Sequence, residues 1–505
     1  METIRVTGIC LAGAKAEAVT VEARFHRAEE GRTEIMVTGL PDPVVREGRG
    51  RLLCALEANG LRPSPGRLFL NLVPASRRKS GEALDLPMFL ASVAALGHLE
   101  AKHLTGKLFM GEVGIDGSLH AVPGGLAAAL VARGSGLEQL IAPAPTAAEA
   151  ACLPEVKALS AGHLTEVLAH LSGRGPDLAP VPIPDGDGLP PAPARLGEVR
   201  GQAAAKQALI VAAAGGHGLL LCGPPGAGKT MLARCLPGLL PPLTIEEQLE
   251  VTCVLSAAGR WPGGLARERP WRAPHHTAST VGLVGGGPAM RPGEITLAHR
   301  GVLFLDELPE FRREALESLR QPMESGTILV SRAGRQEQFP ARFHLVAAMN
   351  PCPCGYRGHG RIPCTCSPHA VRQYRQRISG PLLDRLDLRL EVAPPSSSEL
   401  LAQETAAAPA EGGRAAAAVR AARRRAGVRQ GNTPNAQLSP EQLKTAAPLD
   451  RPGQRFLERA VDRRSLSARA VQALRRVALT LADLEGAPPS AAHLASALGL
   501  RSPLN

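Results

Sequence analysis

The most constraining feature of the chain is a glycine-rich loop that ends in Lys-Thr, Gly223-Pro-Pro-Gly-Ala-Gly-Lys-Thr230. The loop follows the apolar run 219–222 and precedes the helix-like segment 231–234. A strand, a glycine loop and a helix in this order are the context of a phosphate-binding P-loop. Glycines let the backbone approach phosphates with its N–H groups, and a helix N-terminus favours anions. The sequence therefore predicts a protein that binds ATP or GTP.

Two carboxylates follow a second apolar run, and an amide follows a third. The segment 301–308 is typical of a buried strand that ends in Asp306 and Glu307. Parallel strands present their carboxyl ends at the phosphate edge, so we expect Asp306 in the Mg²⁺ shell and Glu307 to orient or deprotonate the attacking water. The strand 344–349 ends in Asn350, which could polarise the same water or simply make a turn before Pro351.

The residues expected to bind the nucleotide and its magnesium ion have distinct roles. Lys229 should contact the β- and γ-phosphates, while Thr230 and Asp306 should bind magnesium. The nucleotide-binding residues expected from the sequence are Gly223, Pro224, Pro225, Gly226, Ala227, Gly228, Lys229, Thr230 and Asp306.

An arginine after a short apolar segment points to a shared site. Arg385 follows the segment 379–384. The charge on a transferring phosphoryl group is commonly met by an arginine from a neighbouring molecule, and such a residue needs an exposed loop. We therefore expect a ring of subunits in which Arg385 completes the neighbour's site.

The length of 505 residues is too great for one core and predicts about three domains. Residues 1–171 alternate strand-like and helix-like segments and predict an α+β domain, and residues 172–195 are a linker rich in Pro and Gly. The P-loop core should span 196–394, and residues 395–505 show helical periodicity without strands. In the first part, strands are expected at 1–7, 18–25, 33–38, 68–73 and 139–142, and helices at 43–59, 85–96 and 125–133.

Charge and hydropathy narrow the partners only slightly. A formal charge of +12 suits a polyanion, but the chain is rich in Arg and Ala throughout, so composition explains the charge as well. A basic run mildly favours DNA, although such a run is most often a solvated face; its members are Arg420, Arg423, Arg424, Arg425 and Arg429. The apolar runs are too short for a membrane span and no signal peptide is visible, so we expect a cytoplasmic protein with no membrane partner.

Four of the ten cysteines form one cluster, Cys352-Pro-Cys354 and Cys364-Thr-Cys366. Four thiolates from two tight turns fit a tetrahedral structural zinc site, although Cys-x-Cys gives a narrower bite than Cys-x-x-Cys. His359 and His369 are close enough in sequence to replace one cysteine. Reduced cysteines in a loop are the alternative, which the polar character of the segment disfavours because free cysteine prefers burial.

The order of these motifs resembles the AAA+ ATPases of the magnesium-chelatase-like group, and within it the bacterial competence proteins. The residues that carry the resemblance are Gly201-Gln202, the P-loop, Arg272-Ala-Pro-His-His276, 292–299, the acidic strand, Asn350-Pro-Cys-Pro-Cys-Gly355 and 378–385. The resemblance covers essentially the whole chain. It implies a hexameric ring that hydrolyses ATP, translocates on single-stranded or branched DNA and drives branch migration when incoming strands recombine.

The resemblance also implies a fold and a sensor arginine, and the residue pattern adds a hairpin. The fold is an α/β AAA+ P-loop core with a carboxy-terminal helical lid, preceded by an α+β ribosomal-S5-like (Lon-protease-like) domain. The lid carries a sensor arginine, which points to Arg469, although an ordinary surface arginine explains that residue too. Residues 326–339 predict a β-hairpin that turns at Ala333-Gly334, with Arg332 and Arg335 either meeting phosphates in a channel or simply solvated.

Adjacent histidines and two alanines bear on further functions. His275 and His276 would face opposite sides of a strand and would not share a metal, so a structural or nucleotide-sensing role is open.

Lon-type proteolysis needs a serine and a lysine, and the resemblance aligns those positions with Ala83 and Ala127. We therefore expect a non-proteolytic domain. Two alternatives to a DNA motor remain, a chelatase-like ATPase that remodels a protein partner and, less well supported, a Lon-like protease.

Overall fold

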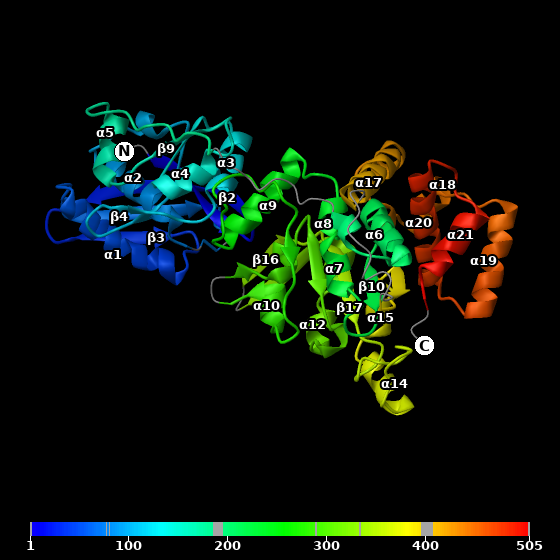
Figure 1. Cartoon of the computed structure of the whole chain (residues 1–505). Helices are drawn as coiled ribbons and strands as arrows, with labels where there is room; N and C mark the ends of the chain where they lie inside the picture. Colours follow the sequence, from blue (N-terminus) through cyan, green and yellow to red (C-terminus); the bar gives the residue numbers. More distant parts are fainter. Residues whose placement is uncertain are drawn as a thin grey trace.

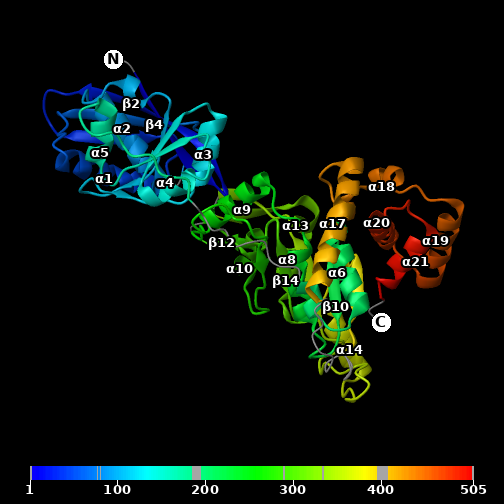
Figure 2. The same cartoon turned by 45° about the horizontal axis from the view of Figure 1, so that its top comes forward.

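The computed structural model of the chain describes residues 3–76, 78–79, 81–184, 195–287, 290–332, 335–394 and 408–502, with the backbone alone at 332, 335, 408 and 409. Three parts follow one another along the molecule (Figure 1): an amino-terminal sheet with its helices, a central sheet that carries the P-loop, and a carboxy-terminal group of helices. The view turned by 45° shows the same order (Figure 2). The predicted linker at 172–195 lies partly outside the described residues, and its boundaries stay predictions.

The amino-terminal part is a seven-stranded mixed sheet in the order β3-β4-β2-β1-β5-β8-β9. The long β1–β2 hairpin is antiparallel, whereas β1, β5, β8 and β9 run parallel to one another. The strands of this sheet are β1 Ile4–Ala12, β2 Lys15–Arg27, β3 Thr33–Thr38, β4 Gly66–Val73, β5 Lys107–Phe109, β8 Gln139–Ala142 and β9 Lys157–Ser160. A separate antiparallel ribbon joins β6 Glu112–Val113 to β7 Leu119–His120. The helices are α1 Pro43–Ala58, α2 Asp85–Ala95, α3 Gly125–Gly134, α4 Ala144–Ala150 and α5 Leu164–Ser172.

Local signals explain why these elements were predictable. Helix α1 begins at Pro43 because the side chain of Asp42 accepts a hydrogen bond from the Val45 N–H at 2.9 Å and caps the first turn. Along β4, buried residues alternate with more exposed ones, as expected for a strand with one face on the core. The predicted strands and helices of this part are confirmed, with shifts of a few residues at their ends.

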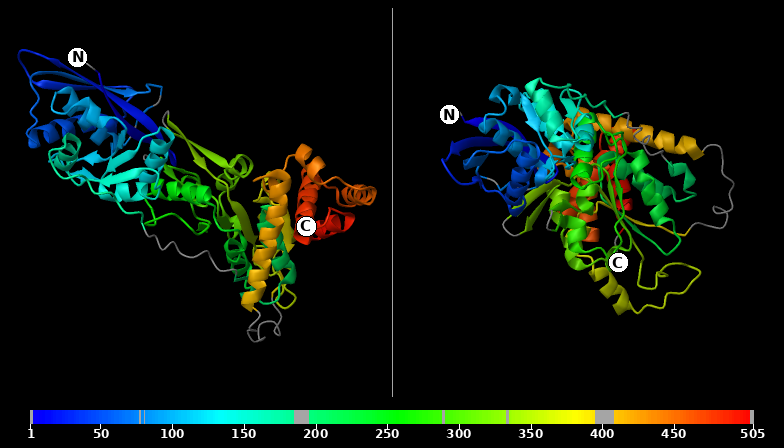
Figure 3. Two further views of the ribbon diagram at one scale, coloured as in Figure 1. Left: turned by 90° about the horizontal axis from the view of Figure 1, so that it is seen from above. Right: turned by 90° about the vertical axis from the view of Figure 1, so that its left-hand side faces the viewer.

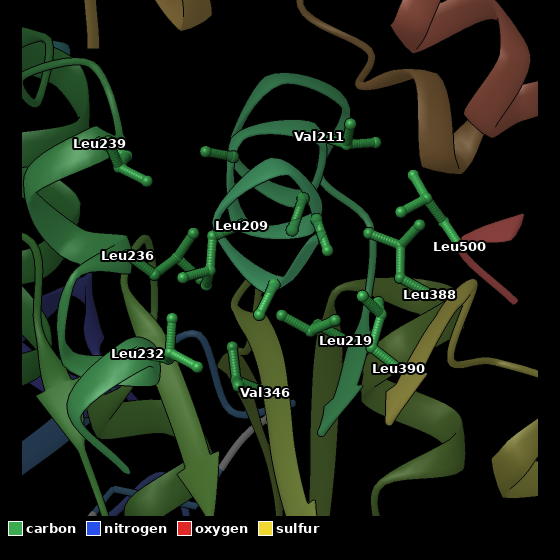
Figure 4. Close-up of a cluster of buried hydrophobic side chains, with 14 of the residues drawn as sticks. Leu209, Val211, Leu219, Leu232, Leu236, Leu239, Val346, Leu388, Leu390 and Leu500 are labelled. Atoms are coloured by element: carbon green, nitrogen blue, oxygen red, sulfur yellow. The ribbon is translucent and has the colours of Figure 1, made fainter. Parts of the chain in front are cut away.

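The central sheet has five parallel strands in the order β11-β14-β17-β10-β18. Parallel sheets need apolar cover on both faces. Helix α6 (Ala203–Gly215) covers one face. Figure 4 shows its Leu209 beside Leu236, while Leu500 lies against Leu388 of β18. The strands are β10 Leu219–Cys222, β11 Trp271–Arg272, β14 Val302–Leu305, β17 His344–Met349 and β18 Leu388–Glu391.

The remaining elements of the central part surround this sheet. The helices are α6 Ala203–Gly215, α7 Lys229–Arg234, α8 Leu236–Leu239, α9 Ile245–Ala257, α10 Thr280–Val284, α11 Glu294–Leu297, α12 Arg313–Glu317, α13 Arg320–Ser325, α14 Pro368–Gln376 and α15 Gly380–Leu383. Two small ribbons are β12 Gly285–Gly286 with β13 Arg291–Pro292, and β15 Thr327–Arg332 with β16 Arg335–Pro340. The β15–β16 pair confirms the predicted hairpin, in which Arg332 lies opposite Arg335, while its turn at 333–334 lies outside the described residues.

The carboxy-terminal helices pack on the central part through α17 and α20, which both contact α6. Figure 3 shows the long helix α17 beside the central part and the last helices beyond it. These elements are α17 Ala408–Gln430, α18 Pro440–Ala446, α19 Arg451–Arg464, α20 Ala468–Glu485 and α21 Ala491–Gly499.

The basic run on α17 is largely occupied by contacts within the protein. Arg423 donates two hydrogen bonds to the Ala213 carbonyl at the end of α6, and burial lowers its pKa to about 10. Arg425 and Arg429 donate to the backbone and side chain of Asp483. Arg423, Arg425 and Arg429 thus make contacts within the protein, with α6 and α20, and a contact of the run with DNA stays a prediction.

A buried polar contact joins the amino-terminal part to α9. The carboxylate of Glu149 accepts hydrogen bonds from Ser256 Oγ at 2.6 Å and from the Gly125 N–H at 2.9 Å. Ser256 Oγ also accepts a hydrogen bond from the Gly124 N–H at 2.9 Å. Burial raises the pKa of Glu149, opposed by these hydrogen bonds. The loop before α3 and the end of α9 are thus fixed to each other.

No helix within the described part of the chain combines the length and the apolar character that crossing a bilayer requires.

Candidate nucleotide site

The P-loop connects β10 to α7 at the carboxyl edge of the central sheet. Gly226 and Gly228 have φ of +78° and +81°, a region that suits glycine, and a Cβ on either would meet open space. Gly223 is glycine for a different reason, because a Cβ there would lie 2.3 Å from the Val392 carbonyl oxygen. The loop is therefore held close to β18 on one side and open on the other, as a phosphate cradle requires.

The ammonium group of Lys229 lies inside this loop. Its Nζ donates hydrogen bonds to the Gly223 and Pro224 carbonyls at 2.7 and 3.0 Å and to Asn350 Oδ1 at 3.1 Å. Burial lowers the pKa of Lys229, opposed most strongly by the charge of Asp306. The end of β17 and the P-loop thus meet at one ammonium group, which brings Lys229 and Asn350 together as expected.

The two residues expected to bind magnesium are in direct contact. Thr230 Oγ1 donates a hydrogen bond to Asp306 Oδ2 at 2.9 Å, and Asp306 Oδ1 accepts one from the Glu307 N–H at 2.9 Å. A hydroxyl and a carboxylate are hard oxygen donors of the kind Mg²⁺ prefers. Thr230 lies in the first turn of α7 and Asp306 just after β14, so both donors meet at the same sheet edge and fit that cation.

Glu307 has an unusual backbone and a histidine partner. Its φ is +52°, a left-handed conformation that costs a non-glycine residue about 1–2 kcal/mol. Its Oε2 lies 2.9 Å from His276 Nδ1, and half of the Glu307 side chain stays exposed. Backbone strain of this kind is concentrated at functional sites. The strained residue is here the one expected to activate water.

The two histidines do not face opposite sides, which corrects the expectation. Strand β11 ends at Arg272, and Pro274 interrupts the extended run before the histidines. The rings of His275 and His276 lie against each other with centroids 4.1 Å apart. Since β11 pairs with β14, the pair arrives next to Glu307. Sequence reasoning missed this contact, although it had singled out the Arg-Ala-Pro-His-His motif.

The four cysteines form one compact group beyond Asn350. Their sulfur atoms all lie within 4.8 Å of one another, and Cys352 Sγ is 3.3 Å from Cys354 Sγ and 3.6 Å from Cys364 Sγ. Four sulfurs around zinc at about 2.3 Å stand roughly 3.8 Å apart, so the donor set and its spacing fit that ion. Hydrogen bonds from the Tyr356 and Thr365 N–H groups lower the pKa of the Cys354 thiol to about 5, whereas burial and the neighbouring cysteines raise the pKa of the Cys364 and Cys366 thiols. Within the described residues, His359 and His369 are not part of the group.

The cysteine loop touches the P-loop. Gly355 follows the first cysteine pair with φ of +86°, and a Cβ there would lie 2.8 Å from Pro225 Cδ and 3.9 Å from Asn350 Cγ. The Cys352 carbonyl accepts a hydrogen bond from the Gly355 N–H at 3.0 Å. Arg375 of α14 donates to the Pro351 carbonyl and braces the same segment. The cysteine group is therefore packed directly against the phosphate cradle.

Arg385 lies at the other end of the central strands. It precedes β18, whose residue Leu388 pairs with Leu219 at the start of β10, whereas the P-loop follows the end of β10. Four strand residues span roughly 13 Å. Arg385 therefore cannot reach the P-loop of its own chain.

Arg385 is also less exposed than expected, which is a second correction. Its side chain is 12% exposed, its guanidinium pairs with Glu324, and its Nη1 donates to the Pro381 carbonyl at 2.7 Å. The apolar segment before it forms the short helix α15, which folds the arginine back onto α13. Arg469, in the first turn of α20, is exposed and lines with Arg385 a cavity of about 330 Å³.

The two positions expected for a protease dyad carry no catalytic side chain, because both are alanine. Ala83 and Ala127 are buried in the same apolar cluster. Ala83 also lines a cleft of about 430 Å³ between the amino-terminal and central parts. Among the described residues that line this cleft there is no serine, threonine, cysteine or lysine.

Family models match three stretches of the chain. "Subunit ChlI of Mg-chelatase" matches residues 21–146, "Magnesium chelatase, subunit ChlI" matches 195–400, and "Magnesium chelatase, subunit ChlI C-terminal" matches 411–501.

Similar proteins cover the chain to different extents. Competence protein ComM of Haemophilus influenzae is 39% identical over 506 residues, 97% of this chain and 96% of ComM. The YifB protein of Salmonella typhimurium is 40% identical over 499 residues, 97% of this chain and 95% of YifB. The magnesium-chelatase 67 kDa subunit of Heliobacterium mobile is 31% identical over 215 residues, 36% of this chain and 32% of that subunit. The similarity to ComM and YifB thus runs along nearly the whole chain, whereas that to the chelatase subunit is confined to a part.

Proposed function

Because the chain belongs to the ComM/YifB branch of the magnesium-chelatase-like AAA+ ATPases, we propose that it is an ATP-driven motor that acts on single-stranded or branched DNA. The proposed assembly is a hexameric ring in the cytoplasm that promotes branch migration when incoming strands recombine. In this proposal residues 395–505 form the lid of the AAA+ core, and residues 1–171 form a non-proteolytic S5-like domain. The name of the Haemophilus influenzae relative, a competence protein, supports the DNA role.

The meeting of six side chains at one sheet edge carries the ATPase part of the proposal. The contacts Lys229–Asn350, Thr230–Asp306 and His276–Glu307 join the P-loop, β14 and β17. Lys229 would neutralise the β- and γ-phosphates, and Thr230 and Asp306 would hold Mg²⁺, which supplies positive charge to the phosphate oxygens when bound. Glu307 accepts the proton of the attacking water, and the Asn350 amide orients that water.

The residues at the amino ends of the central strands support the proposal of a ring of subunits. Arg385 and Arg469 line one cavity at the amino ends of β10 and β18, away from their own P-loop. We propose that both arginines act on the nucleotide of the neighbouring subunit, where they stabilise charge on the transferring phosphoryl group. A head-to-tail interface of this kind closes into a ring. On assembly, Arg385 would leave its ion pair with Glu324 and contact the nucleotide of the neighbouring subunit.

Two further elements have proposed roles. Cys352, Cys354, Cys364 and Cys366 would hold a structural zinc ion that keeps the loop at Gly355 against Pro225. The β15–β16 hairpin, in which Arg332 and Arg335 pair in register, is the proposed contact with DNA phosphates.

A second function is favoured by a specific similarity. The magnesium-chelatase 67 kDa subunit matches about a third of this chain, which supports a motor that remodels a protein partner. The same nucleotide site would serve both functions, so the partner must be identified by experiment. A Lon-like protease is disfavoured because Ala83 and Ala127 carry neither a nucleophile nor a base.

The test measures ATP turnover with and without forked or single-stranded DNA at two salt concentrations. We expect DNA to stimulate turnover and higher salt to weaken DNA binding, because phosphate contacts release counterions. Glu307→Gln is the control, which should lose turnover by about 10²–10⁴ while still binding ATP and DNA. Turnover that DNA does not change, together with no salt-sensitive DNA binding, would reject the DNA motor and favour a protein partner.

A further inference from the structure

A buried chain of polar side chains is centred on His217, between α6 and β10. His217 is 1% exposed, and its two ring nitrogens have different partners. Nδ1 lies 2.8 Å from Asp387 Oδ2, and Nε2 lies 2.7 Å from Thr480 Oγ1. Asp387 and Thr480 are themselves buried. Because a carboxylate only accepts hydrogen bonds, His217 Nδ1 donates to Asp387 and fixes the orientation of the ring.

The three members of this chain lie next to three functional segments. His217 comes just before β10, the strand that leads into the P-loop. Asp387 comes just after Arg385, between that arginine and β18. Thr480 belongs to α20, the helix that carries Arg469 in its first turn. One imidazole therefore connects the P-loop strand, the arginine segment and the carboxy-terminal helices.

Further buried contacts make the connection stiff. Thr480 Oγ1 accepts a hydrogen bond from Asn435 Nδ2 at 3.0 Å, and the same amide donates to Asp483 at 2.8 Å. On the other side, Arg501 Nη1 donates to the Leu386 and Asp387 carbonyls, both at 2.9 Å. A satisfied buried network of this kind fixes one arrangement, since each unpaired polar atom would be costly. The backbone beside Arg385 is thus tied both to α20, through Asp387 and His217, and to Arg501.

We propose that His217 is a positioning residue that sets Arg385 according to the position of the carboxy-terminal helices, and so acts on the nucleotide site of the neighbouring subunit. This inference rests on the proposed site shared between subunits. A movement of α20 would pull Thr480 and His217, and Asp387 would carry the movement to Arg385. The nucleotide state of one subunit would then change the completeness of its neighbour's site.

The matched variants are Thr480→Val and Thr252→Val. Thr480→Val keeps the side-chain shape and removes the hydroxyl that meets His217. Thr252→Val removes an equally buried hydroxyl from α9, which donates to the Gln248 carbonyl and lies in another part of the protein. His217→Asn retains an amide for Asp387 and loses the contact with Thr480, so it should change ATP turnover in the same way as Thr480→Val.

We expect Thr480→Val to lower ATP turnover between about tenfold and a hundredfold, the effect of a displacement of about 1 Å, without weakening ATP binding. Thr252→Val should lower the thermal stability about as much as Thr480→Val does, and it should leave ATP turnover unchanged.

Mixing variants distinguishes an effect on the neighbour from an effect within one subunit. Lys229→Ala removes the P-loop lysine and keeps the arginine edge, so each mixture pairs it with a variant whose P-loop is intact. When the two variants are mixed in equal amounts and assemble into rings at random, half of the P-loops are intact and half of the neighbouring arginine edges are intact. About one interface in four therefore has both. We expect mixtures of Lys229→Ala with Thr480→Val, or with Arg385→Ala, to recover turnover well above the sum of the separate proteins.

The outcomes separate the two proposals. Recovery with Arg385→Ala but none with Thr480→Val and His217→Asn would overturn the role of His217, since its effect would lie within its own subunit. No recovery with Arg385→Ala would overturn the shared site itself and the role of His217 with it. Equal loss of turnover in Thr480→Val and Thr252→Val would mean that general destabilisation explains the loss, and would also overturn the proposal.

Discussion

Replacing Gly355 by alanine tests whether the cysteine loop holds the P-loop in place. At φ of +86°, any residue other than glycine costs about 1–2 kcal/mol. The added Cβ would also stand 2.8 Å from Pro225 Cδ. An ordinary carbon–carbon contact of about 3.5 Å requires a displacement of about 0.7 Å. Because Pro225 belongs to the phosphate cradle, and a misplacement of about 1 Å costs up to about a hundredfold in rate, we expect ATP turnover to fall between about tenfold and a hundredfold.

The matched control is Gly360→Ala in the same loop. Gly360 has φ of +77°, so alanine there meets a similar backbone cost, but its Cβ would have no neighbour within 4 Å. Steady-state turnover and thermal melting are measured for both variants. Gly360→Ala should melt earlier than the wild type and keep turnover within about twofold. Equal turnover in the two variants would refute the reasoning, because the contact with Pro225 would then not matter.

Three further outcomes are expected. His276→Ala should raise turnover without DNA by up to about tenfold, because it frees Glu307 from a charge-assisted hydrogen bond; an unchanged rate would exclude that restraint. Cys364→Ser should lose zinc, measured by metal analysis against about one ion per wild-type chain. The His299 and Arg300 side chains lower the pKa of Glu250 to about 2, so its contribution to stability is complete above the ordinary glutamate value and is lost as pH falls towards 2. Glu250→Gln should therefore lower the melting temperature at pH 7 and lower it less at pH 3, and a difference independent of pH would contradict this.

Features carried by contiguous residues were predictable. The P-loop needs glycine at positions with positive φ and an apolar strand before it, and Gly226, Gly228 and β10 meet these conditions locally. Helix α1 was visible for the same reason, since its cap and its first-turn proline are neighbours in sequence. The carboxyl ends of parallel strands meet at one edge, which made the meeting of Asp306 and Asn350 with the P-loop predictable as well.

Contacts set by strand order and by packing were not predictable. His276 reaches Glu307 because β11 is the neighbour of β14, and nothing in either segment specifies that pairing. Arg423 has the sequence context of a solvated arginine, but α17 lies along α6 and turns it towards the Ala213 carbonyl. Arg385 was expected to be exposed, and its pairing with Glu324 depends on how α15 folds onto α13.

The most direct test of the account measures ATP affinity and ATP turnover together in Arg385→Ala. The P-loop and Arg385 lie at opposite ends of β10 and β18, so the variant retains every described contact of Lys229 and Thr230. We predict unchanged ATP affinity and a loss of turnover of about 10³–10⁵, the contribution of an arginine supplied by a neighbouring molecule. Loss of ATP binding, or turnover close to that of the wild type, would contradict a nucleotide site completed by the next subunit.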